Sequence, residues 1–315
     1  MYIGIDLGGT NIAVGLVTGE GKLVTKASLP TLAGRDYKEI VEDMAKLCRM
    51  VTDEGNVSMD VIKAIGIGSP GSIDSKNGIV VFAGNLALDK APVAEELGKY
   101  FDIPVHMEND ANAAAYGEYI ACGIDSDSFV FITLGTGVGG GIIINKKIYS
   151  GFNGIGAEIG HMTLKMGGEK CNCGNYGCYE KYASVTALIE QTGKAIEENP
   201  DSIMNDWVKE NGHISGRTAF ECAKRGDAAA TEVRDNYIRY VAEGIVSVVN
   251  IFQPELIVIG GGISKEGDVI LKPLKDFVNN REFNKDMPKT DIRIAQLFND
   301  AGIIGAAMAA KNVDK

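Results

Sequence analysis

The sequence contains no hydrophobic run of the roughly eighteen residues that a membrane-spanning helix needs. Its first residues also lack the basic segment and long apolar stretch of a secretory signal. Positive charge is in deficit: 31 Lys and Arg stand against 42 Asp and Glu, for a formal net charge of -11. Nucleic acids and anionic membranes would be repelled by such a chain. We therefore expect a cytoplasmic protein that binds small molecules, with neither nucleic acid nor membrane as a partner.

Two nucleotide-binding motifs are also missing. No G-x-x-x-x-G-K-[ST] segment occurs, which argues against a P-loop enzyme. The run from Gly135 to Gly140 matches G-x-G-x-x-G, but a predicted strand follows it where a dinucleotide-binding domain has a helix. A nicotinamide enzyme is thereby disfavoured, and any phosphate site has to be built on hairpin turns.

The chain does contain alternating strand and helix patterns over its whole length of 315 residues. Strands with glycine turns are predicted over residues 1–26, and a similar strand–glycine–strand pattern begins at Phe129, which suggests two related halves. Further strands are predicted over 61–68, 105–108, 256–259 and 292–295, and helices over 37–53, 93–100, 111–121, 232–252 and 301–311. This alternation predicts an α/β fold.

Three glycine-rich segments follow predicted strands, at 6–11, 135–141 and 260–262. Glycine lets backbone amides approach phosphate oxygens closely, although each segment alone is more typical of a tight turn. Asp6 could hold magnesium through water. The residues that could contact nucleotide phosphates are Gly9, Thr10, Asn11, Thr136, Gly137, Gly261 and Gly262. The combination favours phosphoryl transfer as the reaction class.

Asp110 stands where a short predicted strand gives way to an alanine-rich helix. A kinase that acts on an alcohol needs a carboxylate near the attacking hydroxyl, and Asp110 is the best placed candidate for that base. The alternative is that Asp110 only caps the helix, since Asp and Asn are favoured capping residues.

The most specific motif consists of His161, Cys171, Cys173 and Cys178, which lie within eighteen residues. Three thiolates and an imidazole can close a tetrahedral zinc site. Glu158 and Glu180 flank this cluster. Glu158 and His161 are three residues apart, so one helical turn would point both side chains the same way. The spacing leaves two interpretations open: a purely structural zinc clip, or a zinc site that also shapes a sugar pocket.

Together these segments resemble the ROK family of sugar kinases and repressors, within the actin-like ATPase superfamily. The resemblance covers nearly the whole chain. The matching segments are 6–11, Gly68-Ser69-Pro70-Gly71, Glu108 to Ala113, 134–141, Glu158 to His161, 171–180 and 259–262. One departure concerns the pocket wall: many members place Gly-Trp after Asn85-Leu86, whereas Ala87-Leu88 follows here.

The resemblance implies a two-domain actin-like ATPase (ribonuclease H-like) fold with duplicated halves, a small domain of residues 1–115 plus 300–315 and a large domain of 116–299. It implies ATP and Mg²⁺ bound between the domains, Asp110 as catalytic base, structural Zn²⁺ on the His161 and cysteine cluster, and a homodimer. Sugar contacts are implied for Asn85, Asn109, Asp110, Glu158, His161 and Glu180.

The match is most similar to bacterial glucokinases, which implies transfer of phosphate from ATP to the 6-hydroxyl of glucose. Kinases of mannose, fructose, N-acetylglucosamine or N-acetylmannosamine remain alternatives, because single pocket contacts decide between such sugars. A non-catalytic sugar sensor of the repressor kind is the more distant alternative, because the first hairpin begins at residue 2 and the charge is acidic.

Overall fold

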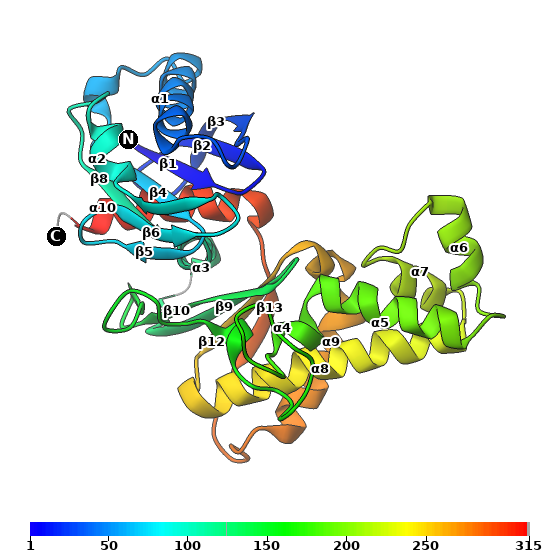
Figure 1. Ribbon diagram of the computed structural model, residues 1–315. Coiled ribbons are helices and arrows are strands. Elements are labelled where there is room, and N and C mark those ends of the chain that lie inside the picture. Colours follow the sequence, from blue (N-terminus) through cyan, green and yellow to red (C-terminus); the bar gives the residue numbers. More distant parts are fainter. Residues whose placement is uncertain (124, 314–315) are drawn as a thin grey trace. The chain divides into compact units, whose positions relative to one another are not determined.

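A computed structural model describes residues 1–123 and 125–313 (Figure 1). The chain divides into two compact units. Unit 1 comprises Met1–Phe131, Gly141–Ala157 and the segment from Gln296 on, and unit 2 comprises Ile132–Gly140 and Glu158–Ala295. The predicted domain boundaries at 115/116 and 299/300 stay a prediction, and residues 314 and 315 lie outside the described part. Among the described residues no helix is long and apolar enough to cross a membrane.

Unit 1 is built on a five-stranded sheet in the order β3-β2-β1-β4-β8. Strands β1, β2 and β3 are antiparallel neighbours, whereas β4 lies parallel to both β1 and β8. The interior strand β4 is buried along its whole length, as expected for a parallel strand covered on both faces. The strands are β1 (Tyr2–Leu7), β2 (Asn11–Val17), β3 (Leu23–Pro30), β4 (Ile65–Ser69) and β8 (Val105–Asn109).

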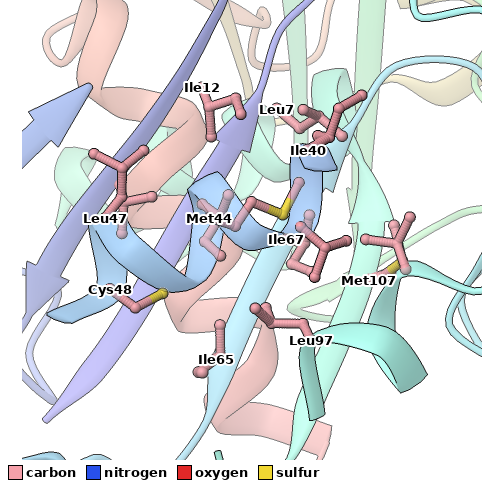
Figure 2. Close-up of a cluster of buried hydrophobic side chains, with 14 of the residues drawn as sticks. Leu7, Ile12, Ile40, Met44, Leu47, Cys48, Ile65, Ile67, Leu97 and Met107 are labelled. Carbon is pink, nitrogen blue, oxygen red and sulfur yellow. The ribbon is translucent and has the colours of Figure 1, made fainter. Parts of the chain in front are cut away.

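Helices cover both faces of this sheet (Figure 1). They are α1 (Tyr37–Glu54), α2 (Val93–Gly98), α3 (Asp110–Cys122) and α10 (Ala301–Val313), with 3-10 turns η1 (Met59–Val61) and η4 (Phe298–Asp300). Figure 2 shows the core between the sheet and α1, where Ile40, Met44 and Leu47 of the helix pack with Ile65 and Ile67 of β4. The apolar residues of α1 recur at helical spacing, so they form a single buried face.

Helix α10 lies directly on the backbone of the sheet, because the sheet presents glycines to it. A Cβ on Gly66 would lie 1.8 Å from the carbonyl oxygen of Ala306, and one on Gly4 would lie 1.8 Å from that of Ile303. Helix α3 approaches α10 equally closely, since a Cβ on Gly305 would lie 1.6 Å from the carbonyl oxygen of Ala113. Small residues thus allow α10 to pack closely on the sheet and on α3.

The chain enters α10 through a turn fixed by a buried carboxylate. Glu118 of α3 is fully buried and accepts hydrogen bonds from the backbone amides of Gln296 (2.9 Å), Leu297 (2.8 Å) and Phe298. Several amide donors can replace the water that a buried carboxylate loses. Glu118 therefore ties α3 to the start of α10.

Unit 2 carries most of a second sheet, whose order is β11-β10-β9-β12-β13. Its strands are β9 (Ser128–Leu134), β10 (Val138–Ile144), β11 (Lys147–Ile148), β12 (Leu256–Gly260) and β13 (Asp291–Ile294), and the boundary between the units crosses β9 and β10. A hairpin followed by two later strands repeats the order of the first sheet. The predicted duplication of the chain is confirmed in this topology.

The helices of unit 2 gather along the long α8, which α4, α5, α7 and α9 contact (Figure 1). They are α4 (Glu180–Ala183), α5 (Val185–Glu198), α6 (Met204–Asn211), α7 (Thr218–Lys224), α8 (Ala228–Phe252) and α9 (Asp268–Arg281), with 3-10 turns η2 (Ile159–His161) and η3 (Gly262–Glu266). The Asp227 side chain caps α8 by accepting from the amide of Ala230 (2.7 Å). Pro254 lies two residues beyond the end of the helix.

Helices α4, α5, α6, α7 and α9 were not predicted from the sequence, and the prediction differs from the structure in two further places. Residues 61–68 were predicted as one strand, but Val61 ends a 3-10 turn and β4 begins only at Ile65. Ser58 starts that turn by accepting from the amide of Asp60, a local cap that competes with the extended conformation. The second difference is a small antiparallel sheet that was not predicted, formed by β5 (Ser72–Asp74), β6 (Ile79–Ala83) and β7 (Leu88–Ala91).

Candidate active site and metal centre

The predicted catalytic residues of unit 1 lie at one edge of its sheet. Strands β1, β4 and β8 are parallel, and their register pairs Asp6 with Gly68 and Ser69 with Asn109. The carboxyl ends of the three strands therefore meet, which is where open α/β sheets place their ligands. This arrangement brings Asp6 and Asp110 to the same edge.

Asp110 is the first residue of α3 but not its cap. Asn109 is the N-cap: its side-chain oxygen accepts from the amides of Ala111 (2.9 Å) and Asn112 (3.2 Å). Oδ1 of Asp110 accepts from the amide of Ala111 (2.8 Å). The interpretation of Asp110 as the helix cap is wrong, because Asn109 performs that role.

Burial gives both acidic side chains unusual proton affinity. It raises the pKa of Asp110, with partial compensation from the Ala111 amide. Burial and the nearby charge of Asp110 raise the pKa of Asp6 to about 6. Gly302, in the first turn of α10, makes room for Asp6, since a Cβ there would lie 2.8 Å from Oδ2. Two carboxylates that disfavour each other's charge suit a site for a divalent cation.

Glu108 supports this edge and was not singled out from the sequence. Its Oε1 accepts from the amide of Asn109 (2.9 Å) and from Nδ2 of Asn112 (3.0 Å), and burial raises its pKa. The spacing of four residues between Glu108 and Asn112 was the available signal. Glu108 fixes the turn that presents Asn109 and Asp110.

The first glycine turn lies beside Asn85. A Cβ on Gly9 would lie 3.3 Å from Nδ2 of Asn85, and both residues belong to unit 1. Thr31, the residue after β3, anchors this turn. Its hydroxyl donates to the carbonyl oxygen of Gly8 (2.6 Å), and its amide donates to the carbonyl oxygen of Thr10 (2.8 Å). Thr10 and Asn11 are exposed at the tip of this hairpin and open to a ligand.

The other two glycine loops lie together in unit 2. A Cβ on Gly261 would lie 2.1 Å from the carbonyl oxygen of Leu134, and Gly261 has a positive φ of 88° that favours glycine. Leu134 is followed by the loop Gly135-Thr136-Gly137. The structure thus unites the predicted residues Thr136, Gly137, Gly261 and Gly262 in one region.

The predicted metal ligands converge within unit 2. The ligand atoms of His161, Cys171, Cys173 and Cys178 all lie within 4.8 Å of one another. Nδ1 of His161 lies 3.7 Å from Sγ of Cys171, and the sulfurs of Cys173 and Cys178 are 3.6 Å apart. Metal–ligand bonds of about 2.0–2.3 Å in a tetrahedron separate neighbouring ligands by about 3.5–3.8 Å. The donor set and its spacing fit zinc.

The flanking glutamates differ in their relation to the cluster. Glu180 begins α4, and its Oε1 accepts from Sγ of Cys171 (2.9 Å) and lies 3.7 Å from Nδ1 of His161. Glu158 precedes the 3-10 turn η2, which ends at His161. The thiol of Cys173 is exposed, whereas Cys171 and Cys178 are buried.

Two duplicated sheets, each with an antiparallel hairpin and later strands, together with acidic residues at the strand ends, define a two-domain α/β protein of the actin-like ATPase class. Within that class, the model of the family described as "ROK family" matches residues 2–313. The chain belongs to the ROK family.

Several relatives are similar over nearly the full length. The glucokinase of Thermotoga maritima is 35% identical over 311 residues, covering 98% of this chain and 96% of the relative. A ROK family glucokinase from Streptomyces griseus, solved with glucose and AMPPNP, is 32% identical, with a TM-score of 0.82 and coverage of 98% and 99% of the two chains. A xylose repressor of Caldicellulosiruptor bescii is 30% identical over 96% of this chain and 76% of the repressor.

Proposed function

We propose that this protein is an ATP-dependent sugar kinase that phosphorylates the 6-hydroxyl of glucose, with Asp110 as the catalytic base. The observation that carries the proposal is the Asp110 carboxylate itself. It stands at the carboxyl ends of parallel strands near Asp6, its neighbour Asn109 caps the helix in its place, and burial raises its pKa. A carboxylate with these properties is suited to accept a proton from an alcohol.

In this reaction the sugar hydroxyl oxygen attacks the terminal phosphorus of ATP, the bond from that phosphorus to the bridging oxygen of ADP breaks, and the hydroxyl proton passes to Asp110. Asp6 would hold Mg²⁺, which when bound neutralises charge on the phosphates. The residues that would contact the sugar are Asn85, Asn109, Asp110, Glu158, His161 and Glu180. Gly9, Thr10, Asn11, Thr136, Gly137, Gly261 and Gly262 would contact the nucleotide.

The zinc cluster has a structural role in this proposal. His161 and the three cysteines would hold the ion, which when bound fixes the orientation of the His161 ring. Similarity to the two glucokinases supports glucose as the substrate. The alternatives are mannose, fructose, N-acetylglucosamine and N-acetylmannosamine.

The test is a coupled assay of ADP release with ATP and Mg²⁺ and each of these five sugars. We expect preference for glucose, and an Asp110→Asn variant that loses turnover by about 10²–10⁴-fold while its thermal unfolding curve shows a folded protein. Asp102→Asn, at an exposed aspartate of the same unit, is the control and should keep full turnover. Full activity of Asp110→Asn would refute the assigned base.

A second candidate is a non-catalytic sugar sensor, favoured by the similarity to the xylose repressor. The same assay separates the two functions. A sensor would release no ADP with any sugar, yet calorimetry would detect sugar binding. Turnover with one of the five sugars would exclude this candidate.

A further inference from the structure

Glu180 contacts two different parts of unit 2 with its two carboxylate oxygens. Oε1 faces the metal cluster, at 2.9 Å from Sγ of Cys171 and 3.7 Å from Nδ1 of His161. Oε2 faces the glycine loop, because a Cβ on Gly137 would lie 2.7 Å from it. A carboxylate is a rigid planar group, so a displacement of one oxygen necessarily displaces the other.

The glycine loop is also held by the segment that begins with Glu180. The amide of Val185 donates to the carbonyl of Gly135 (2.8 Å), and the hydroxyl of Thr186 donates to the carbonyl of Thr136 (2.8 Å). Glu180 is therefore at one end of a short segment whose other end supports the loop. Cluster, segment and loop form one continuous set of contacts within unit 2.

We propose that Glu180 is a positioning residue that couples metal occupancy of the cluster to the conformation of the 135–137 loop. The absence of a side chain at Gly137 leaves the space in which Oε2 lies while Oε1 remains on the cluster. An added methyl group there displaces the end of the Glu180 side chain, which is flexible, and leaves the backbone in place. Coupling of this kind is reciprocal, so a ligand that orders the loop also strengthens metal binding.

The two glycines of the loop provide a matched pair of variants. Gly137→Ala places a methyl group 2.7 Å from Oε2 of Glu180, whereas Gly135→Ala meets nothing within 4 Å. The measurement is the half-time of zinc release from purified zinc-loaded protein to the chromogenic chelator 4-(2-pyridylazo)resorcinol. We expect Gly137→Ala to release zinc about tenfold faster than the unsubstituted protein. Gly135→Ala should release zinc at the same rate as the unsubstituted protein. Equal release from all three proteins would overturn the proposal.

Glu180→Asp shows whether the effect passes through the carboxylate. The shorter side chain withdraws from Gly137, so Gly137→Ala should add nothing to zinc release in the Glu180→Asp background. Cobalt-substituted protein gives a second readout, since the visible bands of the cobalt–thiolate site should shift in Gly137→Ala and not in Gly135→Ala. Fully additive effects of the two substitutions would overturn a route through Glu180.

The reverse effect, that of a ligand of the loop on zinc release, is tested with ADP and rests on the proposed function. We expect saturating ADP to slow zinc release from the unsubstituted protein and to have no such effect in Glu180→Asp. ADP binding, seen by calorimetry, with unchanged zinc release would overturn the coupling and leave the kinase proposal intact. Absence of ADP binding, by contrast, would contradict both the kinase proposal and this arm.

Discussion

At the scale of single residues, Asp6 illustrates how a functional site is built at a cost in stability. Burial and the charge of Asp110 raise its pKa from 3.8 to about 6. The folded state therefore binds the proton more tightly than the unfolded chain, so this group makes the protein less stable as pH rises from about 4 to about 6. The cost remains at neutral pH, which lies above the pKa of Asp6.

Asp6→Asn should relieve this cost. At pH 7 in buffer without divalent cations, we expect its free energy of unfolding to exceed that of the unsubstituted protein by at most about 3 kcal/mol, since each pKa unit corresponds to about 1.4 kcal/mol. The advantage should shrink as pH falls from 7 to 5, because the unsubstituted Asp6 then takes up its proton. Urea unfolding across that pH range measures both effects.

Asp102→Asn again serves as the control, since it removes one exposed carboxylate from the same unit. Added Mg²⁺ should stabilise the unsubstituted protein more than Asp6→Asn, because a cation binds more tightly to the Asp6 carboxylate than to a neutral amide at that position. An Asp6→Asn variant less stable than the unsubstituted protein at pH 7 would show that Asp6 is held by favourable contacts instead.

Site residues that are close in the sequence were predictable, and those brought together by packing were not. The ligand set of His161, Cys171, Cys173 and Cys178 follows from local spacing, and the structure places the four ligand atoms within 4.8 Å. The contact of Glu180 with Gly137 joins residues that are 43 positions apart in the sequence. No spacing rule connects such positions, so the sequence could not indicate it.

At the scale of elements, α10 depends on glycines more than on side-chain complementarity. Gly305→Ala would place a methyl group 1.6 Å from the carbonyl oxygen of Ala113, a backbone atom that cannot rotate away. We expect a loss of about 3 kcal/mol or more in the free energy of unfolding, at or above the upper end of typical overpacking costs. Urea denaturation monitored by circular dichroism gives the value.

Gly98→Ala, in another helix, is the control for Gly305→Ala. Gly98 ends α2, and a Cβ there meets nothing within 4 Å. Alanine is the better helix former, so this variant should be as stable as the unsubstituted protein or up to about 1 kcal/mol more stable. Equal stability of Gly305→Ala and Gly98→Ala would show that α10 can shift on α3 without cost.

Most elements of unit 1 were predictable because their apolar residues follow a clear period. The helical spacing in α1 is an example, and the continuous apolar run of β12 is a similar case in unit 2. The sheet of β5, β6 and β7 escaped prediction because its strands are short and partly exposed: Val81 and Phe82 of β6 face solvent. Pairing between neighbouring strands, rather than an apolar pattern, defines that sheet.

At the scale of the whole molecule, the zinc cluster belongs to one unit only. All four ligands lie between residues 158 and 295, and Tyr179, fully buried beside the cluster, donates its hydroxyl to the carbonyl of Val241 in α8 (2.8 Å). Loss of the metal should therefore loosen unit 2 and leave the core of unit 1, around α1 and β4, unchanged.

Hydrogen exchange followed by mass spectrometry tests this expectation. Purified protein should contain about one zinc per chain, as a closed four-ligand site requires. After chelation, we expect faster exchange in residues 159–183 and in α8, and unchanged exchange in α1. Uniformly faster exchange in both units would show that the metal stabilises the molecule as a whole.

The position of α10 in the chain has a consequence for synthesis on the ribosome. Helix α10 covers β1 and β4 through Gly4 and Gly66, yet it is translated after the whole of unit 2. The earliest strands thus leave the exit tunnel long before their covering helix exists. Unit 2 can form its core while the chain is still being synthesised. One face of the first sheet, by contrast, stays uncovered until α10 emerges.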